Sequence, residues 1–192
     1  MNEQHPLPYR IAVRGLIECV ASTVRLLAGH RIHLPRQHVG MRLRFADGTS
    51  ARVYRETVVD GVPRAPCVLV VEFRLWTWAV RGWRTHALFR WESLLNTPLF
   101  VGFPGFVSKL WLANDEHGIY RGVYEWDGPE RAERYARSLW RVLALGCEPH
   151  SIHYRVLPDL RRDALLADPH LLDRRADADA TTAWWRPVEA AA

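Results

Sequence analysis

The chain has 192 residues, of which 48% are hydrophobic and 24% charged, a composition typical of a globular protein that excludes extensive disorder. Its net charge of +5 comes from arginines scattered among acidic residues, which indicates a mixed-charge surface and argues against nucleic-acid binding. Three separated cysteines, no signal pattern at the amino terminus and no long uncharged apolar run predict a reduced, cytoplasmic protein without a membrane span.

Residues 1–66 are expected to form an amino-terminal extension, a helix followed by a β-hairpin. Residues 9–29 carry apolar side chains three and four positions apart, which predicts an amphipathic helix that docks on the protein's own domain. The stripe consists of Val13, Leu16 with Ile17, Val20, Val24 and Leu27. Residues 41–59 alternate apolar and polar side chains around Asp47-Gly48, the pattern of a hairpin.

Residues 67–158 are expected to form the main domain, which contains four strands and two helices. The strands are predicted over residues 67–78, 106–112, 120–126 and 150–157, and the helices over 84–96 and 129–146. The order βαββαβ predicts an α+β, ferredoxin-like antiparallel sheet with its helices on one face. Residues 159–192 are expected to form a short helix and a mobile tail, whose Trp184 and Trp185 dock back or contact a partner.

Charged side chains inside the strands suggest that the second face of this sheet is covered. Simple alternation places Lys109, the only lysine in the chain, on the same face as Arg121 and Glu125. The residues expected to share that face are Glu72, Arg74, Trp76, Lys109, Trp111, Arg121, Glu125, His153 and Arg155. One alternative is that this face is solvated. Apolar residues such as Val70 and Val123 lie between the charges, however, so a solvated face would be an exposed apolar patch, and a second copy of the sheet is the expected cover.

The run PGFVSKLWLANDEHGIYRGVYEWDGPERAERY, residues 104–135, resembles the dimeric α/β-barrel superfamily, in particular its YdhR-type monooxygenase-like proteins. The resemblance extends over residues 67–158. It implies a ferredoxin-like protomer, a homodimer formed by pairing two sheets, and a cavity between sheet and helices. Relatives include cofactor-independent oxygenases, polyketide cyclases, isomerases and haem-binding enzymes, and a shared fold does not select among these activities.

Two groups of residues are candidates for catalysis. His153 with Glu72, Arg74 and Arg155 could move protons near neutral pH, although the pattern favours a charge-paired network that only holds the dimer together. Lys109 and His86 are further catalytic candidates. Substrate contacts are assigned to Glu72, Arg74, Trp76, Trp91, Trp111, Arg121, Glu125 and Arg155.

The sequence predicts no metal site and no cofactor. Haem stays an open alternative, although residues 129–146 contain no histidine that could act as an axial ligand. We therefore expect an enzyme of secondary metabolism, a cofactor-independent monooxygenase or cyclase acting on an aromatic or polyketide-like small molecule. The alternative is a non-catalytic ligand-binding or dimeric assembly protein. Nucleic-acid binding through the arginines is a weaker third option.

Overall fold

The computed structural model describes residues 8–76, 100–148, 150–173 and 183–191. Its elements in chain order are α1 (Tyr9–Ala28), β1 (Ile32–His33), β2 (Arg42–Phe45), β3 (Ser50–Val59), β4 (Pro66–Arg74), β5 (Phe106–Leu112), β6 (Ile119–Asp127), α4 (Pro129–Leu143), β7 (His153–Pro158), α5 (Arg162–Ala167), the 3₁₀ helix η2 (Pro169–Leu172) and β8 (Pro187–Ala191). The helix predicted over residues 84–96, with His86 and Trp91, lies outside the described residues.

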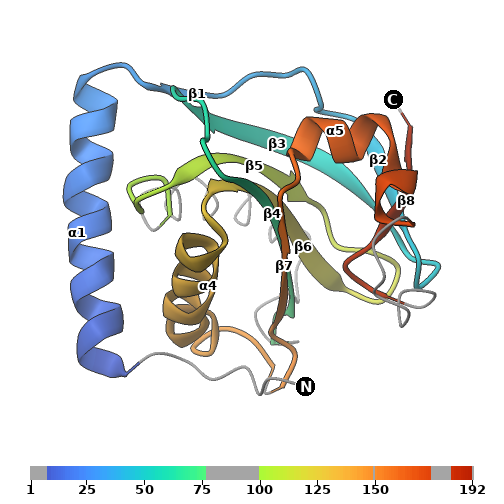
Figure 1. The fold of residues 1–192 in the computed structure, drawn as a ribbon. Coiled ribbons are helices and arrows are strands. Elements are labelled where there is room, and N and C mark those ends of the chain that lie inside the picture. The colour runs from blue at the N-terminus through green and yellow to red at the C-terminus, as the bar shows by residue number, and fades with distance from the viewer. Residues whose placement is uncertain (1–7, 77–99, 149, 174–182, 192) are drawn as a thin grey trace.

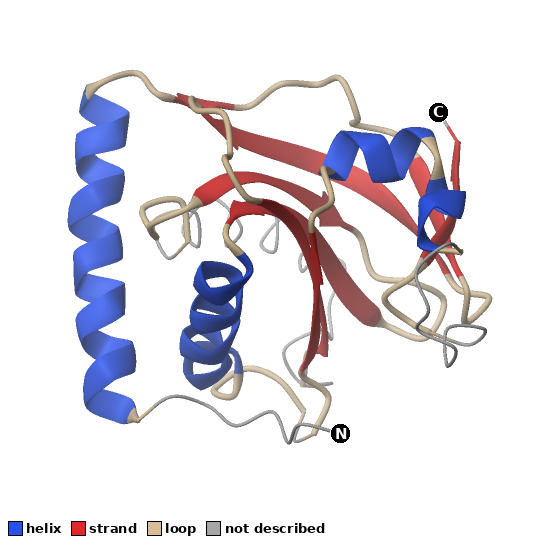
Figure 2. Cartoon of the chain, viewed as in Figure 1, coloured by secondary structure: helices blue, strands red, loops and turns tan. Residues whose placement is uncertain are grey.

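The sheet contains the strand order of a ferredoxin-like fold. Strands β7, β4, β6 and β5 lie side by side in that order, and every pairing between them is antiparallel. The prediction of an antiparallel α+β sheet is therefore confirmed. The sheet does not end at β5, because β3 pairs with β5 and the sheet continues through β2 to β8 (Figure 1). The extensions at both ends of the chain thus belong to the same curved sheet (Figure 2).

One face of the sheet packs against α4 and α1. Residues Leu69 and Tyr124 of the central strands join Tyr135 of α4 and Cys19 of α1 in one apolar cluster. Aromatic rings dominate this cluster, and Trp126 lies with its ring centroid 4.7 Å from that of Tyr135. We call this side the helix face.

The opposite face is covered by the chain itself, which corrects the expectation that a second copy would cover it. Val70 and Val123 of the core strands pack in one cluster with Leu43 of β2 and Leu165 of α5, and Trp184 packs against it. We call this side the latch face. Because α5 and η2 lie on it, helices cover both faces of the sheet, whereas the sequence predicted helices on one face only. Trp184 and Trp185 pack against this cluster, so of the two predicted alternatives, docking back or contacting a partner, the structure shows the first.

Helix α1 docks on the domain as predicted, but of its predicted apolar stripe Leu16 packs against the core while most of the other residues do not. Ala12, Cys19 and Thr23 are buried against the domain, whereas Ile17 and Val24 of the predicted stripe are 65% and 59% exposed. Gly102 explains this choice of side, because its backbone passes so close to the carbonyl of Cys19 that no side chain would fit. In the described part of the chain, no helix is long and apolar enough to cross a membrane.

Candidate functional site

A β-bulge in β5 moves Lys109 to the helix face. Phe106 pairs with Trp126 but Ser108 pairs with Glu125, so Val107 is an extra residue in the ladder. From this point the alternation shifts by one position, and Lys109 lies directly opposite Tyr124. The predicted grouping of Lys109 and Trp111 with Arg121 and Glu125 is therefore wrong, because these pairs lie on opposite faces of the sheet.

The Lys109 amine lies in a cluster of aromatic rings. Its Nζ is 3.2 Å from the ring centroid of Trp111, 4.6 Å from that of Tyr124 and 4.7 Å from that of Phe100. The residue as a whole is only 7% exposed. An ammonium group at such distances is attracted by the electron-rich ring faces, and this attraction replaces part of the hydration lost on burial.

Neighbouring residues hold this cluster in place. The Trp111 indole N–H donates to Thr57 Oγ1 over 3.1 Å, which fixes the orientation of the ring. Gly122 lies opposite Trp111, and a Cβ at this position would be 2.8 Å from the Tyr124 ring and 3.3 Å from Lys109 Cε. Glycine at this point of the strand therefore makes room for the lysine side chain.

Burial lowers the pKa of Lys109 well below its usual range, and the nearby Arg55 guanidinium lowers it further. Arg55 also lies over the Trp111 ring, 5.1 Å from its centroid, and burial lowers the pKa of Arg55 as well. Among the described residues, no carboxylate forms an ion pair with Lys109. The site therefore offers an amine with an increased neutral fraction near neutral pH, next to a second cation and within an aromatic wall.

The two tyrosine hydroxyls beside this cluster stay protonated. Burial raises the pKa of Tyr124 and of Tyr135 above the ordinary tyrosine range. Tyr135 donates a hydrogen bond to the Tyr124 hydroxyl over 3.4 Å. In the described residues the lysine amine is thus the group of this cluster best suited to accept a proton.

Arg121 lies at the centre of a different cluster on the latch face, in which one guanidinium is surrounded by three carboxylates. Its guanidinium lies 2.7 Å from Asp115 and 2.8 Å from Asp47, and it also donates to the Thr49 hydroxyl over 2.9 Å. Glu72 Oε2 is 3.2 Å away but makes no hydrogen bond with it. Asp47 and Thr49 belong to the β2–β3 turn, so this cluster fastens the amino-terminal hairpin to the core sheet.

Two further ion pairs fasten the carboxy-terminal segment over the same face. Arg162 of α5 lies 2.7 Å from Glu56 of β3, and both side chains are almost fully buried. His38 hydrogen-bonds to the same carboxylate over 2.9 Å. Arg161 lies 2.6 Å from Glu125, whose pKa is raised by burial against the lowering effect of the arginines. The charges of the central hairpin on this face therefore pair with the chain's own extensions.

The predicted acid–base group around His153 does not assemble. Glu72 and His153 are cross-strand neighbours, but the carboxylate lies against Arg121 and the imidazole lies near Trp184, with ring centroids 6.2 Å apart. Arg155 lies over the Trp185 ring, 5.2 Å from its centroid. Arg74, at the end of β4, is 3.8 Å from Glu148.

Trp76 lies beyond β4, where its backbone N–H donates to the carbonyl of Gly146, and it is half-buried. Among the described residues, the structure thus brings Lys109 and Trp111 together and separates them from the other predicted site residues, whereas His86 and Trp91 lie outside the described part of the chain. Sequence reasoning missed Arg55, Phe100 and Tyr124 as their neighbours. One signal was available in the sequence: the only lysine of the chain lies inside a predicted strand, and Gly122 lies between large side chains in the next strand.

Among the described residues, no group of three or more histidine, cysteine or acidic side chains could hold a metal ion. The three cysteines are buried, and none of them forms a disulfide bond. Burial raises the pKa of Cys19 to about 11 and that of Cys147 to about 12, which makes both poor nucleophiles.

Comparison with protein-family models and with curated protein sequences gives no match. Among solved structures, the chain is similar to a protein described as a major regulator of staphylococcal pathogenesis, with 15% identity and a TM-score of 0.39 over 59% of this chain and 69% of that one. It is also similar to a ferredoxin-fold protein from Listeria monocytogenes related to antibiotic-biosynthesis monooxygenases, with 11% identity and a TM-score of 0.36 over 59% and 66%.

A monooxygenase-like protein from Listeria innocua matches with 13% identity and a TM-score of 0.37, over 59% of this chain and 67% of that chain. An anthrone oxidase-like protein matches with 13% identity and a TM-score of 0.36, over 59% and 55%. Likeness at this level assigns neither a family nor an activity to the chain. The fold class stated above rests on the strand order of the chain itself.

Proposed function

We propose that the chain is a small-molecule enzyme that begins its reaction by removing a proton from a flat, acidic substrate, with Lys109 as the base. The observation that carries this proposal is the desolvated Lys109 amine in its aromatic cluster. Burying an amine without a carboxylate partner costs stability, and such costs are tolerated where chemistry needs them. The amino-acid pattern of residues 104–135 and its resemblance to monooxygenase-like proteins support the same class of function.

The site chemistry favours an aromatic or polyketide-like substrate with an enolisable C–H or a phenolic O–H. The rings of Phe100, Trp111 and Tyr124 suit the stacking and burial of a flat molecule. Once Lys109 accepts the proton, the resulting ammonium and the Arg55 guanidinium stabilise the substrate anion. In a poorly solvated site the attraction between the substrate anion and these two cations is stronger than it would be in water.

Two reactions can follow the same proton transfer. In cofactor-independent monooxygenation, the substrate anion supplies the electrons that reduce oxygen, and a methylene group plus O₂ gives a carbonyl group and one water molecule. In cyclisation, the carbanion attacks a carbonyl group of the same molecule, and the new alkoxide takes a proton back from Lys109. Both reactions need no metal or organic cofactor. The proposed cytoplasmic location fits cysteines that are buried and form no disulfide bond.

The test compares the wild-type chain with Lys109→Met on naphthols and aryl 1,3-diketones, measuring oxygen uptake and product masses. Methionine keeps the apolar stem but removes the base, so we expect kcat to fall by about 10²- to 10⁴-fold with a small change in KM. Arg42→Met removes an exposed cation on β2 and serves as the matched control. The methyl ethers of these naphthols have no acidic proton, so they should bind to the protein without turnover.

The second candidate is ligand binding without catalysis. It is favoured by the histidine and carboxylate candidates on the latch face, which are engaged in contacts within the chain. Its signature would be tryptophan fluorescence quenching by the naphthols with no product and no oxygen uptake. Turnover that is unchanged in Lys109→Met would contradict the role of Lys109 as the base.

A further inference from the structure

Helix α1 carries an apolar stripe that the rest of the described chain leaves exposed, apart from the half-buried Val13 at its amino-terminal end. The stripe, which we call the outer stripe, consists of Val13, Ile17, Val20, Val24 and Leu27. Val20 and Leu27 are 40% and 54% exposed, and Tyr9 at the start of the helix is also exposed. A contiguous row of large apolar side chains on a protein surface marks an interaction site.

The spacing of the outer stripe indicates another helix as the partner. Its residues follow each other at intervals of four, three, four and three, the 3.5-residue repeat of a narrow coiled-coil seam. A helix lying on a lipid surface needs only a broad apolar side with the 3.6-residue period. Ala21 and Ala28 flank the seam on one side, and their small side chains permit a close approach of a second helix backbone.

The two halves of α1 have complementary shapes. The amino-terminal half carries an apolar-walled groove lined by Tyr9, Arg10, Val13, Arg14, Ile17 and Glu18. The carboxy-terminal half presents Val24 and Leu27 as exposed knobs. A two-fold axis through the middle of the helix would place the knobs of each copy in the groove of the other, which is the self-complementary arrangement of a symmetric dimer.

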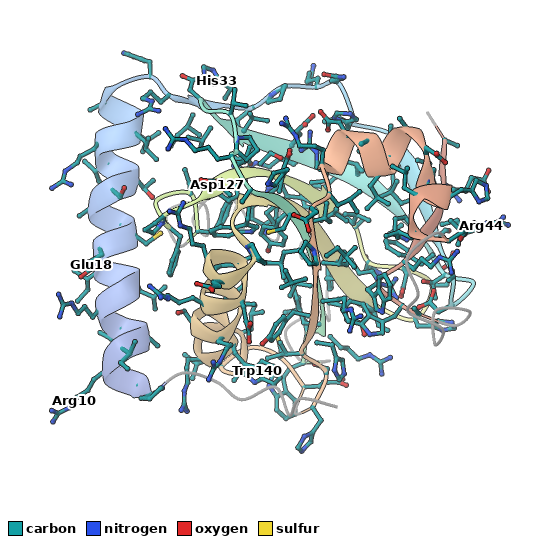
Figure 3. The ribbon with its side chains drawn as sticks, in the orientation of Figure 1. Arg10, Glu18, His33, Arg44, Asp127 and Trp140 are labelled. Atoms are coloured by element: carbon teal, nitrogen blue, oxygen red, sulfur yellow. The ribbon has the colours of Figure 1, made fainter. Side chains whose placement is uncertain are left out.

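Charges are compatible with this antiparallel pairing. In this pairing Val13 packs against Val24 of the second copy, and Ile17 packs against Val20 of the second copy. Arg10 then lies beside the carboxy-terminal end of the other helix. That end carries the negative pole of the helix dipole, which favours a cation, although Arg25 already lies in the last turn. Glu18 and Arg10 lie on the side of α1 that faces away from the rest of the molecule (Figure 3), where they border the groove.

We infer that α1 is a homodimerisation helix and that two copies of this chain pair antiparallel through the outer stripe. This interface is different from the sheet-to-sheet pairing expected from the sequence, whose surface the chain covers with its own latch-face segments. It is also independent of the reaction proposed for Lys109, which lies on the sheet.

Sedimentation velocity of the full chain over a concentration series tests the pairing. We expect a monomer–dimer equilibrium between about 1 and 200 μM, as is usual for an interface of this small size. Ile17→Glu combined with Val24→Glu should weaken the dimer by at least about tenfold, because it buries carboxylates in the seam. Ile11→Glu is the matched control, since Ile11 is equally exposed on α1 but lies off the outer stripe.

Cysteine cross-linking tests the direction of the pair. A mixture of Val13→Cys and Val24→Cys chains should form a disulfide, whereas neither variant should cross-link with itself, because identical positions lie about 16 Å apart along antiparallel helices. Self-cross-linking of Val24→Cys would overturn the antiparallel arrangement. A chain that stays monomeric at all concentrations, or a dimer that persists in the Ile17→Glu and Val24→Glu variant, would overturn the interface. Monomers that sediment with phosphatidylglycerol vesicles through the outer stripe would assign the stripe to lipid instead.

Discussion

The two faces of the sheet treat buried charge in opposite ways. On the latch face, Arg121, Glu125 and Glu56 each have an oppositely charged partner from another segment of the same chain. On the helix face, Lys109 is surrounded by aromatic rings and has another cation, Arg55, as its charged neighbour. Paired charges can stabilise the fold by holding distant segments together, whereas an amine buried among aromatic rings holds no second segment through an ion pair. The comparison therefore separates a structural set of charges from a functional candidate.

Removing Arg121 should have the largest effect on this comparison. Arg121→Met leaves Asp47, Glu72 and Asp115 clustered without their cation, so we expect the free energy of unfolding to fall by about 3–5 kcal/mol. Urea unfolding followed by tryptophan fluorescence measures the change. A loss of less than about 1 kcal/mol would show that the pairing does not stabilise the fold.

Removing Arg162 should have the next largest effect, because it leaves Glu56 buried without its guanidinium partner. We expect Arg162→Met to lower the free energy of unfolding by about 3 kcal/mol, and the double variant with Glu56→Met to recover much of this loss. Urea unfolding of the two single variants and the double variant gives the coupling energy directly. Purely additive effects would contradict a direct Glu56–Arg162 interaction.

The third prediction concerns Glu72, whose pKa is raised to about 7, chiefly by burial. The folded state then holds this proton more tightly than the unfolded chain, so the stabilising contribution is present at acidic pH. It is lost as pH rises from the unfolded value of about 4.3 through 7. Glu72→Gln cannot titrate, so its free energy of unfolding relative to wild type should increase by about 1–3 kcal/mol between pH 4 and pH 8. An unchanged difference across this range would mean that Glu72 does not titrate in it.

The smallest expected effect has the opposite sign. Because the pKa of Lys109 is lower in the folded state than in the unfolded chain, its protonation favours unfolding, and stability should rise with pH from the folded value up to about 10.4. Lys109→Met removes this cost. We therefore expect its free energy of unfolding at pH 7 to be about 1 kcal/mol higher than that of the wild type, while its activity is lost. Arg121→Met is the comparison, because its free energy of unfolding is expected to fall. A marked destabilisation of Lys109→Met would indicate that its cation–π contacts hold the fold together.

Several features of the fold followed from local sequence patterns. The alternation in residues 41–45 predicts Leu43 and Phe45 inside and Arg42 and Arg44 outside, and their burial confirms it. The helical repeat near residue 160 predicts α5, and the turn at Asp47-Gly48 predicts the β2–β3 hairpin. These patterns are reliable because the spacing of neighbouring residues determines which of them share the apolar side of a helix or strand.

The site itself was only partly predictable. Lys109 stood out as the single lysine inside a strand, but its neighbours Phe100 and Arg55 come from segments far away in sequence. The bulge at Val107 decided which face Lys109 occupies, and a bulge depends on how two strands pair rather than on the alternation within either one. The homodimer and the assigned catalytic roles stay predictions.

The sequence by itself determined most of the strands and helices of the described residues, although not β8, and indicated that the charged second face of the sheet has a cover. Only the tertiary structure decided that the cover is the chain's own β2–β3 hairpin and carboxy-terminal segment, and that α1 docks through Cys19 and leaves Ile17 outside. The physical reason is that periodicity shows an apolar surface but not its partner. Burial of an apolar surface is non-directional, so the choice among possible partners depends on shape, charge pairing and chain connection in three dimensions.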